Sequence, residues 1–398
     1  MHKDELILTI NGGSSSIKFS LYKIKWPLKQ IINGQIENIG SINVKLSYNN
    51  TLTKQKNSIS IKAACHDEAA DHLIKWLEEQ EDFDSIRAIG HRIVHGMKHT
   101  APEIISPKLL NELKKISAYD PEHLPEEIKL IEVFRKRCPS LKQVACFDTS
   151  FHASMPTVAK LLSIPRRYHE KGIQHYGFHG LSYSFLMEEL NLLAGSEIAN
   201  GKIILAHLGS GASLAAVKDG KSIDTTMGFT PASGLPMSTR AGDLDPGVAW
   251  YLMKFEKLSP KEFNHLVNHE SGLLGVSETS SDMRELMNAE DTDHRAAEAI
   301  ELFCYRTKKW IGSYAAALNG LDTLVLSGGI GEHSPEVRSK ICDGLGFLGI
   351  ELDEIKNMNN ENIISLNTSK VTVRVIKTNE EIMIARIVCD VLNGSTKK

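Results

Sequence analysis

Three short stretches of small residues have a composition that lets backbone N–H groups approach a phosphate closely. They are residues 11–16 (NGGSSS), 207–211 (HLGSG) and 328–332 (GGIGE). Each follows an apolar run typical of a β-strand, and glycine lacks the Cβ atom that would keep an anion away from the backbone. The third stretch also leads into a helix, and helix N-termini favour anions. These stretches indicate phosphate binding by loops at the ends of strands.

The spacing within the three loops matches neither common nucleotide-binding fingerprint. They contain neither the P-loop pattern G-x-x-x-x-G-K-[ST] nor the dinucleotide pattern G-x-G-x-x-G. Singly, each loop is more simply explained as a tight turn. All three together, in a chain with a repeated strand and turn pattern, favour a nucleotide held between two related halves.

Two arginines lie in surroundings where a positive charge needs a partner. Arg92 lies in a strand-like apolar run (IGHRIV) and Arg240 in a loop of small residues (STRAG), and we expect both side chains to be buried. A buried guanidinium without a partner is costly, and its planar fork suits flat oxyanions. The alternative is that they form structural ion pairs with Asp148 or Asp243.

The elements that must position these residues recur along the chain. The runs 6–10 and 17–22 flank the first loop as a predicted β-hairpin, and the runs 203–206 and 212–217 flank the second loop in the same way. This recurrence favours an internal duplication. The alternative is that two glycine-rich hairpins look alike by chance over so short a stretch.

Helical periodicity accounts for much of the remaining sequence. Helices are predicted over residues 67–80, 107–116, 126–137, 181–193, 247–255, 260–267 and 293–318. Further strands are predicted at 144–147, 324–326 and 371–376, and a last helix is predicted after Asn379. The sequence therefore predicts β/α domains that each contain a hairpin and buried strands.

Length and composition exclude several classes of protein. A chain of 398 residues is too long for one core, so we expect two domains. A balanced net charge of −3 argues against a dedicated binder of nucleic acid or membrane surfaces. The six cysteines form no C-x-x-C pair, which argues against a disulfide scaffold or structural zinc and favours a reducing compartment. Residues 1–10 lack the long apolar segment of a signal peptide, so we expect a cytoplasmic protein.

Long and chemically unusual motifs extend over nearly the whole chain. They are INGGSSSIKFSLY (10–22), GHRIVHG (90–96), FDTSFHASMP (147–156), YGFHG (176–180), AHLGSGAS (206–213), DTTMGFTPASGLPMSTRAGDLDPG (224–247), SDMRE (281–285), LSGGIGEHSPEVR (326–338) and TNEEIMIAR (378–386). In these motifs the chain resembles the acetate/propionate kinase family of the actin, sugar-kinase and Hsp70 superfamily. The resemblance implies an α/β fold of two duplicated ribonuclease-H-like domains with a central nucleotide cleft. It implies domains of residues 1–150 plus 381–398 and of residues 151–380.

The family transfers a phosphoryl group reversibly between ATP and a short carboxylate, giving ADP and an acyl phosphate. The resemblance implies that Arg92 and Arg240 grip the carboxylate and the moving phosphoryl group, and that His179 donates a hydrogen bond to that group. Such a transfer depends on charge neutralisation and in-line positioning more than on covalent chemistry. The alternative for His179 is a core histidine among aromatic residues. The residues that match the apolar wall around the substrate methyl are Val94, Phe178 and Pro231.

Asp148 matches the family's candidate acid/base residue. A carboxylate nucleophile has no proton to lose at neutral pH, so we expect Asp148 to orient an arginine or a magnesium-bound water. Mg²⁺, or Mn²⁺, is expected to bridge the phosphates, and Asn11 and Glu380 match the family's metal ligands. The alternative for Glu380 is an exposed acid at a helix N-terminus, the role that we expect for Glu381.

The resemblance also implies where ATP or ADP binds. The residues expected to contact its phosphates are Lys18, His207, Leu208, Gly209, Ser210 and Gly211, and those expected to form the adenosine pocket are Asp282, Met283, Arg284, Gly328, Gly329, Ile330, Gly331 and Glu332. A solvated strand lysine is the alternative for Lys18. The family is typically homodimeric, and we expect small-molecule substrates but neither a nucleic-acid nor a membrane partner.

Departures from the family pattern cluster near the acyl pocket. The usual A-P-L-H-N-P reads DPEHLP here, which puts Glu122 in place of an apolar residue and Leu124 in place of Asn. The usual G-L-M-M-G-T-R reads GLPMSTR at 234–240. One methyl group is worth only about 1–3 kcal/mol in such pockets, so acetate, propionate and butyrate all remain open. A sugar or glycerol kinase that uses Asp148 as its base also remains open, as does an actin-like or Hsp70-like ATP-driven binding module.

Overall fold

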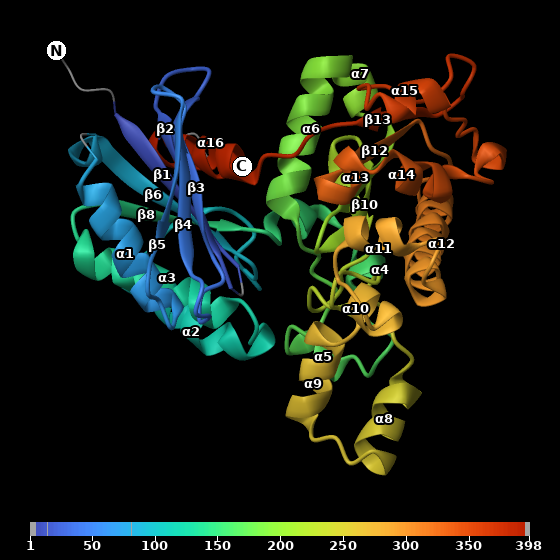
Figure 1. Ribbon diagram of the computed structural model, residues 1–398, viewed down its shortest axis with the longest axis horizontal. Coiled ribbons are helices and arrows are strands. Elements are labelled where there is room, and N and C mark those ends of the chain that lie inside the picture. Colours follow the sequence, from blue (N-terminus) through green and yellow to red (C-terminus); the bar gives the residue numbers. More distant parts are fainter. Residues whose placement is uncertain (1–4, 14, 81, 395–398) are drawn as a thin grey trace. The chain divides into compact units, whose positions relative to one another are not determined.

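The computed structural model describes residues 5–13, 15–80 and 82–394. Ser14 of the first predicted phosphate loop and the predicted domain ends at 1–4 and 395–398 lie outside the described residues. Contacts divide the chain into two compact units (Figure 1). Unit 1 comprises Met1–Ser150 with Asn379–Lys398, and unit 2 comprises Phe151–Thr378.

The described part of unit 1 is built on a sheet of eight strands in the order β5-β4-β3-β2-β1-β6-β8-β7. The strands are β1 (Leu6–Gly12), β2 (Ile17–Lys23), β3 (Lys29–Glu37), β4 (Lys45–Asn50), β5 (Gln55–Ser60), β6 (Ile86–Ile93), β7 (Glu103–Ile104) and β8 (Lys142–Phe147). The strands from β1 to β5 are antiparallel neighbours, whereas β6 and β8 run parallel to β1. The C-terminal ends of β1, β6 and β8 therefore lie at one edge of this sheet.

Helices cover both faces of the unit 1 sheet. They are α1 (His66–Glu78), α2 (Pro107–Ile116), α3 (Leu124–Arg137) and α16 (Glu380–Leu392). Neighbouring residues of a strand point to opposite faces: a Cβ atom on Gly12 would meet Leu130 of α3, whereas Asn11 contacts Glu380 of α16. Thus α3 and α16 pack on opposite sides of β1, and the last helix of the chain completes the first unit (Figure 1).

Unit 2 repeats the central part of this arrangement. In the described residues its sheet has the order β11-β10-β9-β12-β13. The strands are β9 (Lys202–Leu208), β10 (Ala212–Lys218), β11 (Lys221–Thr225), β12 (Thr323–Ser327) and β13 (Thr372–Val375). The first three are antiparallel neighbours, and β12 and β13 run parallel to β9. This is the order and orientation of β3-β2-β1-β6-β8 in unit 1, which confirms the duplicated α/β fold.

The helices of unit 2 include several that the sequence did not predict. The bounds are α4 (Thr157–Lys160), α5 (Arg167–Glu170), α6 (Gly180–Ala194), α7 (Ser196–Ala199), α8 (Pro246–Phe255), α9 (Pro260–His269), α10 (Gly272–Ser277), α11 (Met283–Ala289), α12 (His294–Ala317), α13 (Gly328–His333), α14 (Pro335–Cys342) and α15 (Glu354–Met358). The prediction of a loop at 328–332 was wrong, because this stretch forms α13. The Glu332 carboxylate accepts the Gly328 N–H at 2.9 Å and so stabilises the first turn of α13.

None of the helices in the described part of the chain is long and apolar enough to cross a membrane. The 24-residue helix α12 carries charged residues from Arg295 to Lys309. Its buried residues, among them Ile300, Phe303 and Ile311, form one face, as expected for a helix packed against a protein core.

Candidate active site

The first group of site residues lies where β6 and β8 of unit 1 end. Nε and Nη2 of Arg92 lie 2.8 and 2.7 Å from Oδ2 of Asp148, whose side chain is buried. Nη1 of Arg92 lies 3.3 Å from the carbonyl oxygen of Gly12. Burial opposes the charge, but nearby carboxylates outweigh it and hold the pKa of Arg92 above its usual range. The Arg92 side chain is 14% exposed, so it is mostly buried, as the sequence predicted.

A second carboxylate, Glu127 of α3, also faces Arg92. Its Oε1 lies 3.6 Å from Arg92 Nη1, and its Oε2 accepts the backbone N–H of Val94 at 2.9 Å. The Val94 side chain is buried, as is Leu124 at the start of α3, whereas Glu122 is half-buried. The end of β6 thus presents one guanidinium to two carboxylates.

The two predicted metal ligands lie next to each other. Asn11 at the end of β1 donates from Nδ2 to Oε2 of Glu380, the first residue of α16, at 3.1 Å. This leaves the Asn11 carbonyl oxygen and the other Glu380 oxygen as hard donors, which fits Mg²⁺, an ion that keeps several waters and takes few protein ligands. The described residues contain no cluster of three or more His, Cys, Asp or Glu side chains suited to a metal.

Glu381 is less exposed than the sequence predicted. It was expected to be an exposed acid at the start of the last helix, but it is half-buried. Burial and the neighbouring Glu380 raise the pKa of its carboxyl group, while Lys18 and Asn11 oppose this shift. Lys18 is exposed on β2, directly opposite Asn11 in the hairpin register. Hence Glu381 belongs to the group of polar residues around the predicted metal ligands.

In unit 2, His179 lies at the N-cap of α6 with a left-handed backbone, at φ 58°. Its Nδ1 lies 2.8 Å from the hydroxyl oxygen of Ser213 on β10, and its ring stacks on His207 with centroids 4.3 Å apart. Phe178, just before it, is buried, and its carbonyl lies 2.9 Å from Nε2 of His152. Ser213 and His207 therefore fix the plane of the His179 ring, with Nε2 pointing away from Ser213.

Arg240 and His179 come together beside Gly211. A Cβ atom on Gly211 would lie 3.2 Å from Nε2 of His179 and 4.0 Å from Nη1 of Arg240. Nη1 of Arg240 also donates to the carbonyl oxygen of Pro231 at 3.0 Å, and Pro231 is buried. Arg240 is half-buried rather than buried as the sequence predicted. The missing side chain at Gly211 leaves space next to an imidazole and a guanidinium, as an oxyanion would require.

The second predicted phosphate loop and the start of α13 approach each other closely. Gly328 has φ 75°, and a Cβ atom there would lie 2.6 Å from the carbonyl oxygen of Leu208. A Cβ atom on Gly209 would lie 3.8 Å from the backbone nitrogen of Gly329. The Leu208 side chain is buried, so this residue can offer a ligand only its backbone. Two of the three predicted phosphate-binding stretches are thus neighbours within unit 2.

Several of the other residues predicted to bind the nucleotide have side chains that contact other groups of the protein. Asp282 caps α11 and forms an ion pair with Arg284, with Nη2 and Oδ2 2.6 Å apart on an exposed surface. Met283 is buried. The Glu332 carboxylate accepts backbone N–H groups of Gly328 and Thr378, so its side chain stabilises the backbone here. Gly329 is exposed, Ile330 is half-buried and Gly331 is buried.

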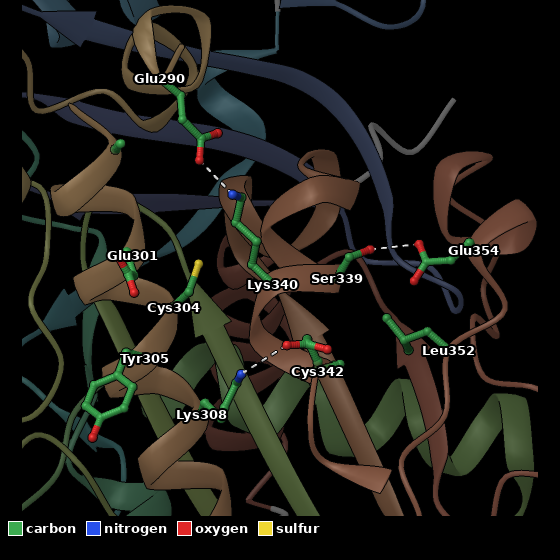
Figure 2. A pocket seen from close by; sticks show the side chains of 12 residues that line it. Glu290, Glu301, Cys304, Tyr305, Lys308, Ser339, Lys340, Cys342, Leu352 and Glu354 are labelled. Carbon is green, nitrogen blue, oxygen red and sulfur yellow. Dashed lines mark hydrogen bonds and ion pairs between the residues drawn. The ribbon is translucent and has the colours of Figure 1, made fainter. Parts of the chain in front are cut away.

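A separate pocket of unit 2 lies between α12 and α14 and contains none of these residues (Figure 2). Its volume is about 650 Å³. Lys340 is paired with Glu290 at 2.6 Å, and Lys308 lies 3.9 Å from Asp343. Burial raises the pKa of the Cys304 thiol in its wall to about 12, so the thiol stays protonated at neutral pH. Its charged groups pair with one another, and we assign it no part in the chemistry.

Comparison with known proteins identifies the family. The model of the Acetokinase family matches residues 6–386. The chain belongs to this family. An acetate kinase of Rhodopseudomonas palustris (strain TIE-1) is 41% identical to it over 396 residues, which cover 98% of this chain and 99% of the relative. An acetate kinase of Rickettsia felis is 40% identical over 385 residues, which cover 96% and 98% of the two chains.

Solved structures of Acetokinase-family enzymes have the same fold. A propionate kinase from Francisella tularensis subsp. tularensis SCHU S4 has a TM-score of 0.91 and 37% identity, over 96% of this chain and 98% of that one. Porphyromonas gingivalis acetate kinase has a TM-score of 0.87 and 35% identity, over 98% and 100% of the two chains. The protein is therefore a phosphotransferase of a family that uses a carboxyl group as acceptor.

Sequence reasoning missed residues that hold the site residues in place. Ser213, which orients His179, and Glu127, which faces Arg92, were not among the predicted site residues. Arg338 was also missed: it is fully buried and donates to the carbonyl oxygen of Gly331 at 3.0 Å, which ties α14 to α13. The signal for Glu127 was weak, because an acid in a helix normally faces solvent.

Proposed function

We propose that this protein is an acetate kinase that transfers the γ-phosphoryl group of ATP directly to acetate, reversibly, and forms ADP and acetyl phosphate. The observation that carries the proposal is the meeting of His179 and Arg240 beside Gly211, next to the glycine-rich loop 207–211. These groups supply a hydrogen-bond donor and a fixed positive charge, which phosphoryl transfer requires. Arg92, held by Asp148, supplies a second guanidinium group that can bind a planar oxyanion.

Each group has a separate task in this proposal. Arg92 binds the acetate carboxylate, Arg240 binds the moving phosphoryl group, and His179 donates a hydrogen bond from Nε2 to its oxygens. Asp148 keeps the guanidinium of Arg92 in one orientation rather than acting as a base, since acetate is already ionised at neutral pH. Val94, Phe178 and Pro231 form the apolar wall for the methyl group.

The nucleotide and the metal complete the proposed reaction. Backbone N–H groups of Gly209, Ser210 and Gly211 bind the phosphates of ATP, and the stretches 282–284 and 328–332 bind its adenosine. Asn11 and Glu380 hold Mg²⁺ or Mn²⁺ through oxygen atoms. When bound, the metal ion neutralises charge on the phosphate oxygens. Lys18, exposed near Glu381, is a further proposed contact to ATP.

We propose that the protein acts in the cytoplasm as a homodimer formed through α8. This helix has no buried residue, although its sequence, PGVAWYLMKF, is mostly apolar. Trp250, Tyr251 and Phe255 are each more than half exposed. An exposed apolar surface of this kind marks an interaction site. In a symmetric dimer, the α8 faces of the two copies would cover each other.

The proposal is tested by trapping the product. The protein is incubated with ATP, Mg²⁺, hydroxylamine and one of acetate, propionate, butyrate or glycerol, and the acyl hydroxamate is measured. Acetate should give the highest kcat/KM, and a chelator in place of Mg²⁺ should abolish product. Phosphorylation of glycerol with no hydroxamate from any carboxylate would refute the proposal.

Propionate is the second candidate substrate. Its support is the solved Francisella tularensis propionate kinase, whose fold matches this chain with a TM-score of 0.91. Glu122 and Leu124, which depart from the family pattern, lie at the start of α3 on the same unit as Arg92. A kcat/KM for propionate above that for acetate would replace acetate by propionate in the proposal and leave the reaction type unchanged.

A further inference from the structure

Glu127 is a buried carboxylate that the proposed reaction does not use. It lies on α3, is 3% exposed, and directs both oxygen atoms toward the end of β6. One oxygen accepts the Val94 N–H. The other, Oε1, accepts no hydrogen bond from any described residue and lies 3.6 Å from Arg92 Nη1. A buried polar atom without a hydrogen bond is costly, so this arrangement needs an explanation.

The guanidinium nitrogen atoms of Arg92 already contact other groups of the protein. Asp148 binds Nε and Nη2, which leaves Nη1, and Nη1 lies between Glu127 and the carbonyl oxygen of Gly12. An ionised Glu127 would give Arg92 two carboxylate partners and change the local net charge from zero to −1. A protonated Glu127 would leave Arg92 and Asp148 as an ion pair with no net charge, and it would attract Nη1 of Arg92 less strongly. The protonation state of Glu127 therefore decides how well Arg92 can accept a third carboxylate.

Four groups on neighbouring segments act on Glu127. Arg92 on β6 and the Val94 N–H favour its ionised form, whereas Asp148 after β8 and Asp120 before α3 oppose it. Asp120 is itself buried, and its bonds to His123 help to keep its pKa low, so it remains an anion. Burial is the largest effect and raises the pKa of Glu127 to about 8. The carboxyl group is then mostly protonated at neutral pH.

We propose that Glu127 is a positioning residue that holds Nη1 of Arg92 when ionised and releases it to the substrate carboxylate when protonated. The inference rests on the proposed function, because it assigns carboxylate binding to Arg92. Substrate affinity then falls as the pH rises through the range where Glu127 ionises. Glu127 touches no reacting atom in this account and acts through Arg92 alone.

The test measures KM for acetate, KM for ATP and kcat between about pH 6 and about pH 9.5 in wild type, Glu127→Gln and Glu132→Gln. Wild-type KM for acetate should rise about tenfold from about pH 7 to about pH 9, with a smaller change in KM for ATP. Glu127→Gln should flatten this dependence to within about twofold. Glu132 lies on the same helix and pairs with Lys114 at the surface, so Glu132→Gln should keep the wild-type profile. A Glu127→Gln variant with the wild-type profile, or a flat wild-type profile, would overturn the proposal.

A second measurement does not depend on activity. The infrared carbonyl band of a buried protonated carboxylic acid should be present in wild type at about pH 7, fall to about half at about pH 8, be mostly lost by about pH 9, and be missing in Glu127→Gln. If that variant does not fold, loss of the band in wild type over the same range still tests the protonation of Glu127. No band at about pH 7 would refute the inference. If no carboxylate is phosphorylated at any pH, the proposed function fails, whereas the infrared result still tests the state of Glu127.

Discussion

Two guanidinium groups and one imidazole carry the proposed chemistry, and each is fixed by a different kind of partner. Arg92 is held by the carboxylate of Asp148, Arg240 by the carbonyl oxygen of Pro231, and His179 by the hydroxyl of Ser213. The carboxylate of Asp148 compensates most of the charge of the Arg92 guanidinium and holds it in one orientation.

His179→Ala should lower kcat about 10²-fold to 10³-fold, the usual effect of removing one donor to a transition-state oxyanion. The fold should survive, because His179 is only half-buried and is not part of the apolar core. Steady-state kinetics and circular dichroism measure the two effects. His294→Ala, at the exposed start of α12, is the matched control and should leave both unchanged. Near-normal turnover in the His179 variant would remove His179 from the mechanism.

At the residue scale, the sequence identified site residues that lie in unusual motifs. It did not identify residues whose role depends on their burial in the folded protein. Asn11 and Glu380 are 369 positions apart, and their contact could be expected only because the family resemblance paired them. Glu127 and Glu381 look like ordinary helix acids in the sequence. Their burial follows from how α3 and α16 pack on β1, which a single sequence does not specify.

At the element scale, the critical feature is the crossing of the end of β9 and the start of α13. Gly328 lets the backbone adopt φ 75° within van der Waals distance of Leu208. Hairpins and many element ends could be predicted from the sequence, as with the helix predicted over 107–116, which is α2 with the same bounds. The helix at 328–333 could not, because three glycines disfavour a helix and only Glu332 and the contact with β9 stabilise it.

Gly328→Ala should destabilise the protein by about 2 kcal/mol or more, from backbone strain and overlap with the Leu208 carbonyl. It should also raise KM for ATP, since it moves the start of the proposed nucleotide-binding stretch. Gly344→Ala is the control: its φ is 74°, but no atom lies within 4 Å of the added Cβ. That variant should lose only about 1 kcal/mol and keep its KM. Chemical denaturation and kinetics compare the two, and equal losses would contradict the close approach described here.

At the scale of the whole molecule, one sheet plan occurs twice, and the last helix of the chain belongs to the first unit. The repeated hairpins indicated this duplication in the sequence. The return of α16 to unit 1 was expected only from the family resemblance, because its amphipathic pattern does not say which sheet it covers. Glu380 enters the site of unit 1 through this return.

The proposed dimer is tested by Trp250→Glu, which puts a charge on the apolar face of α8. Wild type should have twice the chain mass by light scattering, and the variant should have the mass of one chain, because burying an unpaired charge in an interface is costly. Phe347→Glu changes a side chain that is 80% exposed elsewhere on unit 2 and should leave the dimer intact. Monomeric wild type, or a dimeric Trp250 variant, would refute α8 as the interface.

The central claim is that the protein transfers the phosphoryl group directly from ATP to acetate. It is tested most directly with ATP whose γ-phosphoryl group is chiral through isotopic labelling, by determining the configuration of the acetyl phosphate formed. A single in-line transfer predicts inversion, because nucleophile and leaving group lie on opposite sides of the phosphorus. Retention would mean that a side chain such as His179 or Asp148 is phosphorylated on the way. Either retention or the absence of acetyl phosphate would contradict the account.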